Sequence, residues 1–414
     1  MTWWMRFDRF LTERRMTYAW IAGGALWFAW LISSLLGPGN FDLAGQVVGT
    51  DYLQFYTAGE TLRQAQSANL YDFSYQSKLE QTIAGPGLIS FHAFINPPFL
   101  AWLFAPLSLL PYTWSFIIWS LFGLIFLWIS IKLLSIEQPV KVFLWSLTWF
   151  PIFAAISFGQ NSILSLFFFC LSFWFWRKEK YLAAGIVSSL LLYKPQLVLG
   201  IGLLWLLEWR SCWKALLGLA IGGISLAGLC FWLLPDASKV YIELARNFLP
   251  GLIYQEQFPL WHLHSLRGFW ILLFPGQKWL VEGLSLILSV AGLVAYIFFW
   301  RANRKEPDLL FAGAICLTIW ITPHAMIYDW SILLIPAILF WRARPGLKNL
   351  WKPLYALIWI ATFISGILTN AQLKILPVAI QLSLPVLFLV YLEIYKNLVK
   401  HPENSVIQNT SWMV

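Results

Sequence analysis

The sequence predicts an all-α integral membrane protein that crosses the bilayer many times. Of its 414 residues, 59% are hydrophobic and only 11% are charged, and the mean hydropathy is +0.68. Soluble domains carry roughly 25% charged residues, so this chain has too few polar side chains to cover one water-soluble core. Its 27 Trp and 33 Phe residues suit a surface that faces lipid, because Trp is favoured at the bilayer interfaces.

The net charge of +9 comes from Lys and Arg residues that lie mostly between the apolar runs. In a soluble protein this excess would suggest a nucleic-acid partner. In this pattern it indicates membrane topology, and we expect no nucleic acid to bind. Cysteine indicates no metal site, because no CxxC pair occurs and every Cys lies in or beside an apolar run. These residues are Cys170, Cys212, Cys230 and Cys316.

The first spanning helix is predicted at residues 18–36. We expect it to be retained, because its apolar run is too long for the core of a signal peptide and no small-x-small cleavage site follows. Four arginines precede it, which predicts that residues 1–17 are cytoplasmic. They are Arg6, Arg9, Arg14 and Arg15.

Residues 37–96 form a polar stretch too long for a simple connector, so we expect a functional outer loop. FYTAGETLRQAQ and NLYDFSYQSKLEQT predict two short helices within it. Residues 96–111, NPPFLAWLFAPLSLLP, are apolar but broken by prolines. About fourteen helical residues reach ~21 Å, short of the ~30 Å hydrocarbon core, which predicts a re-entrant or tilted segment.

The apolar segment 181–209 has basic residues on both flanks, and both flanks favour the cytoplasm. It therefore predicts two short helices, 182–193 and 196–209, that turn at Lys194 and Pro195, since helix is disfavoured before proline. Counting both, we expect about twelve transmembrane helices in a single domain, 1–414, with both termini inside. Residues 235–277 would be a second large outer loop and 397–414 a cytoplasmic tail. The other spans are predicted at 113–134, 142–158, 161–176, 213–234, 279–300, 309–322, 329–341, 353–369 and 376–396.

Unusual polar residues converge, on this topology, at the outer ends of the helices. Polar groups at membrane depth are costly and need a partner or a function. The stretches are Asp51 in GTDYLQFYTAGE, FGQNS at 158–162, Lys194, WHLHSLRG at 261–268 and TPHAMIYDW at 322–330. Together they gather an acid and several cationic or polar groups where a lipid headgroup phosphate would lie.

Structural explanations compete with a functional one for each of these residues. An acid such as Asp51 in an outer loop is most often only solvated, Gln160 and Asn161 would cap the helix that follows, and Lys194 would extend to the headgroups. The alternation of His262 and His264 has no Cys or Glu at ligand spacing beside it, and His324 at a helix end would serve as a polar cap. The combination at one leaflet favours a functional site.

The chain resembles glycosyltransferase family 87, once catalogued as a domain of unknown function, whose characterised members are polyprenyl-phosphate-mannose-dependent mannosyltransferases with the membrane-embedded GT-C fold. One departure is Asn96, where the family often has Tyr before Pro-Pro. The matching pieces keep their order and span residues 51–268, with a looser match beyond. They are DYLQFYTAGETL, LYDF, NPPFLAWLFAPLSLLP, GQNSIL, AAGIVSSLLLYKPQLVLGIGLLWLLEWRSCWKAL, HSLRG and PHAMIYDWSILLIP.

The resemblance implies a GT-C-type helical bundle in the bacterial cytoplasmic membrane, with its active site on the extracytoplasmic face. It implies a polyprenyl-phosphate-linked sugar as donor, a lipid or glycan as acceptor, and no nucleotide sugar. Asp51 would be the general base, and Lys194 and His324 would contact the donor phosphate.

The chemistry itself needs one carboxylate as base and fixed cations or donors for the developing phosphate charge. Arg63 and Arg267 are further candidate cations. No DxD motif occurs on a loop, so we expect no metal and no other cofactor. Rival bases are Asp42, Glu60 and Asp329. The candidate substrate-binding residues are Tyr52, Tyr56, Gln160, Asn161, His262 and His264.

Two other functions stay open at this point. A transporter or flippase for a lipid-linked sugar would share the basic outer pocket, but it is expected to place ionisable groups near the midplane. The activity of a polysaccharide ligase or polymerase typically depends on a large outer loop late in the chain that carries paired arginines. Arg246 and Arg267 are spaced too loosely to favour this function.

Overall fold

The computed structural model describes residues 3–255 and 258–400, and in this part of the chain the regular structure is helical. Two isolated β-bridges pair Phe41 with Val47 and Leu263 with Met326. The α-helices are α1 Trp3–Phe10, α2 Glu13–Leu36, α3 Tyr52–Arg63, α4 Phe73–Ala84, α5 Pro98–Phe104, α6 Tyr112–Leu133, α7 Pro139–Leu147, α8 Phe150–Ser157, α9 Ser162–Arg177, α10 Tyr181–Ser189, α11 Leu199–Leu207, α12 Trp209–Leu233, α13 Pro235–Asn247, α14 Leu266–Leu273, α15 Lys278–Ala302, α16 Pro307–Ile321, α17 Leu334–Ala343, α18 Lys348–Leu373 and α19 Ser383–Tyr395.

Short helical turns connect many of these helices. The 3₁₀ turns are η1 Ser67–Asn69, η2 Leu107–Leu109, η3 Leu190–Tyr193, η4 Pro195–Val198, η5 Leu249–Tyr254, η6 Leu260–His262, η7 Ile327–Leu333 and η8 Pro345–Leu347, and a π-helical turn, η9, covers Lys396–Lys400.

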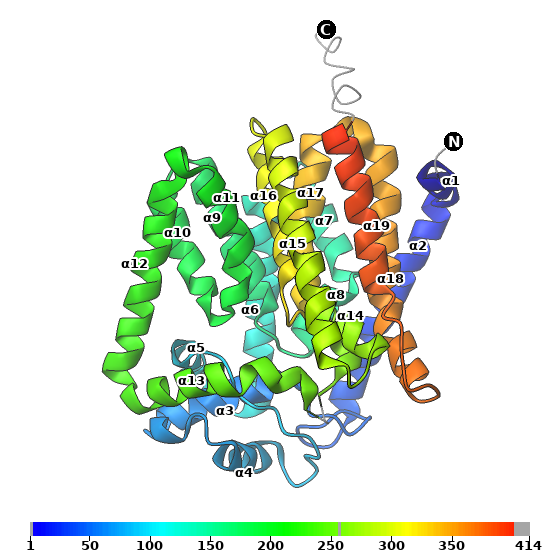
Figure 1. Cartoon of the computed structure of the whole chain (residues 1–414). Coiled ribbons are helices and arrows are strands. Elements are labelled where there is room, and N and C mark those ends of the chain that lie inside the picture. Colours follow the sequence, from blue (N-terminus) through cyan, green and yellow to red (C-terminus); the bar gives the residue numbers. More distant parts are fainter. Residues whose placement is uncertain (1–2, 256–257, 401–414) are drawn as a thin grey trace.

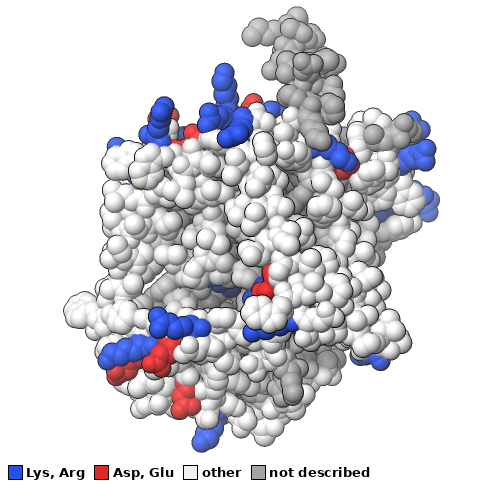
Figure 2. Space-filling view, viewed as in Figure 1, with Lys and Arg blue, Asp and Glu red and all other residues white. Residues whose placement is uncertain are grey.

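The helices form one bundle with a separate layer at one end (Figure 1). α1 and the end of α19 lie at the upper end of the bundle. α3, α4, α5 and α13 lie across the lower end, so the predicted outer segments 37–96 and 235–277 meet there. Lys, Arg, Asp and Glu gather at the two ends of the molecule, and a band between them is almost free of charge (Figure 2). A band of this kind is what a bilayer requires.

Five segments are long and apolar enough to cross a membrane: α2, α6, α12, α15 and the continuous run of η8 and α18. α7 and α8 would make a sixth span if the pair, which is bent by 72°, is counted as one. The remaining predicted spans contain helices that are too short or are interrupted, such as α9 and α16. The prediction of about twelve spans counted apolar runs, and many of these runs are broken where neighbouring protein covers the backbone. These helices establish an all-helical membrane protein with five or six candidate spans.

Local predictions for the outer loop and for the proline-broken segments are confirmed. α3 and α4 overlap the two stretches predicted as short helices of the outer loop, but α3 begins three residues before its stretch and α4 ends two residues after its own. α5 has only 7 residues, and a helix of that length does not cross a bilayer, as expected for the proline-broken segment. Lys194 is extended, with φ −131° and ψ 82°, between η3 and η4, so the apolar hairpin does break at Lys194 and Pro195.

Two large buried cores support the site. One is built mainly from the apolar faces of α8, α9, α16 and α17, with Trp330 fully buried inside it. The other is aromatic and joins α3 to α5 and α6, with Phe55 stacked on Phe104 at 4.9 Å. The start of α9 belongs to both regions, since Ile163 packs in the first core and Leu164 in the second.

Candidate active site

Asp51 is fixed by its backbone rather than by its side chain. It precedes α3 at the N-cap position, but its carboxylate makes no capping hydrogen bond. Instead the N–H groups of Asp51 and Tyr52 both donate to the carbonyl oxygen of Phe158, each at 2.9 Å. Phe158 directly follows α8, so the outer loop is tied to the turn between α8 and α9. The carboxylate is thereby left free for chemistry.

Two glycines make this close approach possible. Gly49 and Gly159 have φ angles of +71° each, in the left-handed region that side chains rarely adopt. A Cβ on Gly159 would lie 2.5 Å from the Cβ of Tyr52, and a Cβ on Gly49 would lie 2.5 Å from the Phe116 ring. Glycine is therefore required at both positions for the segment 49–52 to reach the turn 158–160. The chain turns sharply at Gly49.

Gln160 links this turn to the segment that precedes α17. Its side-chain amide nitrogen donates to the Tyr328 hydroxyl at 3.1 Å, and its amide oxygen accepts from the Asn161 N–H at 3.2 Å. Gln160 also hydrogen-bonds the Asp51 carboxyl group. It therefore connects Asp51 with η7, two segments that are far apart in the sequence.

Lys194 and Asp329 form a buried ion pair beside Asp51. The Lys194 ammonium lies 2.7 Å from Asp329 Oδ1, and the two side chains are 16% and 7% exposed. The same oxygen accepts from the Ser162 hydroxyl at 2.8 Å, and Oδ2 accepts from the Met326 N–H at 3.1 Å. The ammonium also lies 5.5 Å from the centre of the Tyr328 ring.

The turn that carries Lys194 is held from two further directions. The carbonyl oxygen of Tyr193 accepts from the side chain of Asn96 at 3.3 Å. The Tyr193 hydroxyl pairs with Ser165 at 2.6 Å and donates to the carbonyl oxygen of Asn161 at 3.2 Å. The Asn96 that precedes Pro-Pro is thus a direct support of the Lys194 turn.

The electrostatics of this cluster raise the pKa of Asp51 to about 6. Burial is the main cause, because it disfavours the charged carboxylate. The hydrogen bond from Gln160 and the positive charge of Lys194 act in the opposite direction, and the negative charge of Asp329 adds to the increase. A carboxylate with a pKa near neutrality is suited to take up a proton during a reaction.

The segments 261–268 and 322–330 pair directly at the edge of this cluster. The N–H of His264 donates to the carbonyl oxygen of Ala325 at 2.6 Å, and the indole N–H of Trp330 donates to the carbonyl oxygen of His264 at 3.0 Å. The His262 ring packs edge-on against Phe158, with centroids 6.0 Å apart. All the polar stretches that the sequence placed at the outer helix ends therefore meet in one region.

The model of glycosyltransferase family 87 matches residues 94–323, more than half of the chain. The chain belongs to glycosyltransferase family 87. Comparison with curated proteins and with solved structures gives no match.

Membership in glycosyltransferase family 87 makes this chain a membrane-embedded sugar transferase. The matched residues contain Gln160, Lys194 and His264. Asp51 and Asp329 lie outside the matched range, and the contacts described above bring them to the matched part. The roles of the individual side chains therefore rest on the geometry.

The three histidines of this glycosyltransferase differ in their surroundings. Burial lowers the pKa of His262 and His324 to about 4 and that of His264 to about 3, so all three are neutral at pH 7. His264 Nδ1 pairs with the Ser383 hydroxyl at 2.7 Å. Nε2 of His324 is buried and has no hydrogen-bond partner among the described residues. His324 is thus available as a neutral donor rather than as a cation.

Tyr52 and Tyr56 lie in the aromatic core beneath the cluster. Tyr52 is fully buried, and its hydroxyl pairs with Ser115 at 2.5 Å. The Tyr56 hydroxyl donates to the carbonyl oxygen of Leu110 at 2.8 Å. The structure therefore gives both rings a packing function, and neither lies open to a sugar.

Arg63 and Arg267 are each paired with an acid, and the charge of Arg267 acts on His324. Arg63 is exposed at the end of α3 and forms an ion pair with Glu60. Arg267 forms an ion pair with Glu282 at the start of α15. Lys194 is also paired with an acid, but it is the cation whose charge acts on Asp51.

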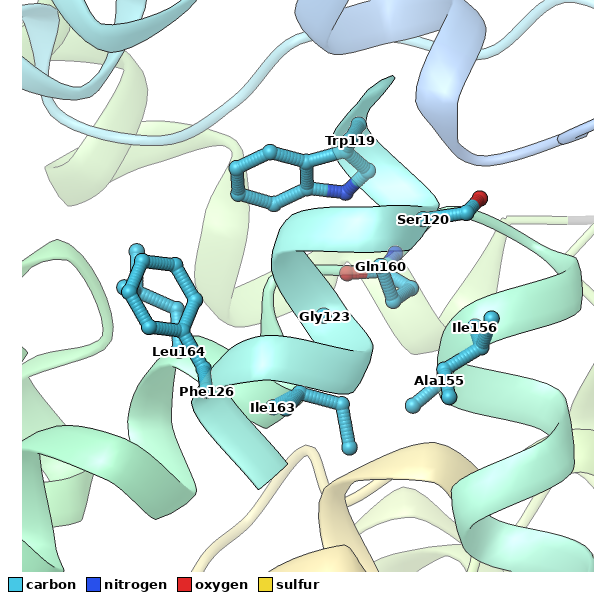
Figure 3. A pocket seen from close by; sticks show the side chains of 9 residues that line it. All are labelled: Trp119, Ser120, Gly123, Phe126, Ala155, Ile156, Gln160, Ile163 and Leu164. Atoms are coloured by element: carbon cyan, nitrogen blue, oxygen red, sulfur yellow. The ribbon is translucent and has the colours of Figure 1, made fainter. Parts of the chain in front are cut away.

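A small pocket lies beside Gln160, between α6, α8 and α9 (Figure 3). Its volume of about 10 Å³ is room for about one water molecule. Trp119, Ser120 and Gly123 contribute from α6, and the Ser120 hydroxyl has no partner in the described part of the chain. This pocket is too small for a sugar, so it supports the packing around Gln160 rather than a substrate.

Sequence reasoning missed the partner of Lys194. Asp329 was considered only as a rival base, and the roles of Tyr328, Ser162 and Tyr193 were not foreseen. One signal was present, because a cation within apolar segments requires a counter-charge and Asp329 is an acid that opens an apolar run, DWSILLIPAILFW.

Proposed function

We propose that this family 87 glycosyltransferase moves a sugar from a polyprenyl-phosphate donor to an acceptor hydroxyl, with inversion at the anomeric carbon and Asp51 as general base. The observation that carries the proposal is the environment of the Asp51 carboxyl group. It is half-buried, has a pKa of about 6 and lies within the electrostatic reach of Lys194. General bases work best when their pKa is near the working pH.

The reaction is a single displacement. The acceptor oxygen attacks the anomeric carbon while its proton passes to the Asp51 carboxylate. The bond between the anomeric carbon and the phosphate oxygen breaks on the opposite side, and its electron pair stays with that oxygen. One carboxylate is sufficient, since no covalent sugar–enzyme intermediate forms.

The leaving group gains one negative charge as it departs. The donor is a phosphodiester, and the product is a polyprenyl phosphate monoester with an additional charged oxygen. Lys194 is the cation that stabilises this charge, because it is the cation beside Asp51 and its side chain is partly exposed. Asn161 and His324 are the neutral groups that would complete the phosphate contacts, and the buried amide atoms of Asn161 have no hydrogen-bond partner among the described residues.

The remaining substrate assignments rest on the family and on the position of the cluster. The donor sugar would be mannose or a related sugar, and the acceptor a lipid or glycan. The cluster lies toward the end of the bundle that carries α3, α4 and α13 (Figure 1). Arg6, Arg9, Arg14 and Arg15 lie before or at the start of α2, at the other end. By the positive-inside rule the site would face outward from the bacterial cytoplasmic membrane.

The decisive experiment measures transfer by the purified protein in lipid nanodiscs. The donor is polyprenyl phosphate carrying radiolabelled mannose, and the acceptor is a total lipid extract of cells that lack this protein. We expect Asp51→Asn to bind the donor and to lose transfer by a factor of about 10² or more. Asp236→Asn is the control, because Asp236 lies on α13 with its side chain 72% exposed.

Transfer by Asp51→Asn at the rate of the unchanged protein would reject Asp51 as base and direct the search to Asp42, Glu60 and Asp329. Movement of intact donor across the membrane without transfer would support a flippase instead. Extension of a glycan by whole lipid-linked units would support a ligase or polymerase.

The proposed orientation has its own test. Ala68 is exposed within η1, and Lys305 is exposed between α15 and α16. A membrane-impermeant thiol reagent applied to intact cells should label Ala68→Cys and should label Lys305→Cys only after permeabilisation. The opposite pattern would place the site on the cytoplasmic face.

A further inference from the structure

We propose that Asp329 is a positioning residue that holds the Lys194 ammonium away from Asp51 and so keeps the Asp51 carboxylate free to act as base. The inference rests on the proposed function of Asp51. It concerns the competition of two carboxylates, Asp51 and Asp329, for one ammonium group.

Asp329 is anchored independently of Lys194. Its two carboxylate oxygens accept hydrogen bonds from the Ser162 hydroxyl at the start of α9 and from the Met326 N–H before η7. Asp329 itself lies in η7, which packs against α8 and α9. The carboxylate would therefore keep its position if the ammonium moved. The turn that carries Lys194 is held through Tyr193, but the ammonium stands on a flexible four-carbon stem and can move.

Lys194 is close enough to both acids for the choice to matter. It contacts Asp329 directly at 2.7 Å and acts on Asp51 through its charge. The Asp51 carboxyl group has a hydrogen bond from Gln160, which is a neutral partner. Without Asp329, the ammonium would gain most by moving onto Asp51, since an unpaired buried cation is costly.

Such a move would disable the base. A carboxylate in direct contact with an ammonium has its pKa lowered by about 1–3 units, and its oxygens are occupied by the cation. The loss of the Asp329 charge acts in the same direction, because that charge helps to raise the pKa of Asp51. The titratable groups that face Asp51 are Lys194 from the turn between η3 and η4, Asp329 and Tyr328 from η7, and Tyr112 from α6.

The experiment titrates Asp51 directly and measures transfer in parallel. Infrared difference spectra of the protein in nanodiscs follow the carboxyl band that Asp51→Asn removes. In Asp329→Asn we expect the titration midpoint to fall by about one pH unit or more from its value near 6. We expect the acid limb of the pH–rate profile to move with it, and the rate at pH 7 to fall about tenfold.

Two further variants separate positioning from general damage to the fold. Lys194→Met should raise the midpoint, and Asp329→Asn combined with Lys194→Met should return it close to the original value, because the cation that would move onto Asp51 is then absent. Ser162→Ala leaves both charges and loosens Asp329, so it should lower the midpoint by a smaller amount. It serves as the test if Asp329→Asn does not fold.

An unchanged midpoint in folded Asp329→Asn, or in Ser162→Ala where the first variant does not fold, overturns the inference. A midpoint that falls in Asp329→Asn and stays low in the double variant also overturns it, because the shift would then not depend on Lys194. The spectroscopic midpoint does not require transfer. The transfer rate of Asp51→Asn therefore tests whether Asp51 is the base. The spectroscopic midpoints separately test whether Asp329 keeps Lys194 away from Asp51.

Discussion

The ammonium of Lys194 lies 2.7 Å from Asp329 Oδ1, and this ion pair sits beside the half-buried carboxyl group of Asp51. The three residues come from three segments: the break in the apolar hairpin, the turn before α17 and the start of α3. Their charges determine how the site is expected to respond to pH and to substitution.

The rate of transfer should fall on acidification with a midpoint near pH 6. Asp51 must be ionised to accept a proton, and burial raises its pKa to about 6. We expect kcat/KM to fall about tenfold per pH unit below this value. A profile that stays flat down to pH 5 would contradict the assignment of Asp51. The measurement needs a donor concentration below KM and a parallel test of folding at each pH.

Asp51→Asn should not destabilise the protein at pH 7. The folded-state pKa of Asp51 lies above its ordinary value of 3.8. Its contribution to stability is therefore complete below about pH 4 and is lost as the pH rises through about 6. Removing the charge should raise the free energy of unfolding at pH 7 by about 3 kcal/mol. Thermal unfolding in detergent checks this, and a lower midpoint than that of the unchanged protein would contradict it.

Lys194→Ala should weaken donor binding, and Lys194→Arg should recover only part of it. A planar guanidinium does not replace a compact ammonium in a site built around one. The alanine variant also leaves Asp329 as an uncompensated buried acid, so we expect a loss of stability of about 3 kcal/mol. Binding is measured by titration with polyprenyl-phosphate mannose in nanodiscs. Equal affinity in all three proteins would leave Lys194 with the role of a structural counter-ion.

Gly159→Ala should abolish transfer because it disturbs the position of Asp51. The left-handed backbone costs about 1–2 kcal/mol for a non-glycine residue, and the new Cβ would overlap Tyr52. We expect a total loss of stability of about 2–4 kcal/mol. The matched control is Gly283→Ala in α15, where a Cβ has nothing within 4 Å. A Gly159→Ala protein with full activity would show that the tie between the outer loop and Phe158 is dispensable.

Glu80→Gln should stabilise the protein at alkaline pH. Glu80 is fully buried on α4, accepts the His92 N–H at 3.0 Å, and burial raises its pKa to about 8. Because this pKa is raised, the stability that Glu80 provides in its neutral form is lost as the pH increases from about 4.5 to 8. Glutamine keeps the shape without the charge, so the variant should gain about 3–5 kcal/mol at pH 9 and little at pH 4.

The control for this prediction is Glu243→Gln, since Glu243 is exposed on α13. Thermal unfolding between pH 4 and pH 9 gives the comparison. Parallel curves for Glu80→Gln and the unchanged protein would show that Glu80 is not the group whose ionisation limits alkaline stability.

The sequence predicts local features of this fold well, because they depend on neighbouring residues. Pro195 fixed the break in the hairpin at Lys194, and the composition of 37–96 indicated α3 and α4. The sequence also indicated which stretches meet, since a polar group within an apolar segment needs a polar partner. The length of each span was less predictable, because a short helix is tolerated where other helices cover its ends.

Pairings across the chain were not predictable from the sequence. Nothing near Lys194 indicates that Asp329, rather than Asp51, accepts its charge. Tyr52 and Tyr56 stand beside Asp51 in the sequence, and only the packing of α3 against α5 and α6 turns both rings into the core. Helical rotation separates neighbours in sequence, so adjacency to a candidate base did not imply contact with the substrate.

The hydrogen bonds from Asp51 and Tyr52 to Phe158 have a consequence for biosynthesis. The ribosome makes about 5–20 residues per second, so the start of α3 emerges roughly 5–20 seconds before its partner at the end of α8. During that interval its two N–H groups must be satisfied by water or by another protein. Lys194 is made next and has to wait again until Asp329 appears. The order of synthesis therefore assembles the base, its supporting turn and its counter-ion pair in three stages, and a nascent chain stopped before residue 329 would carry an unpaired lysine in an apolar hairpin.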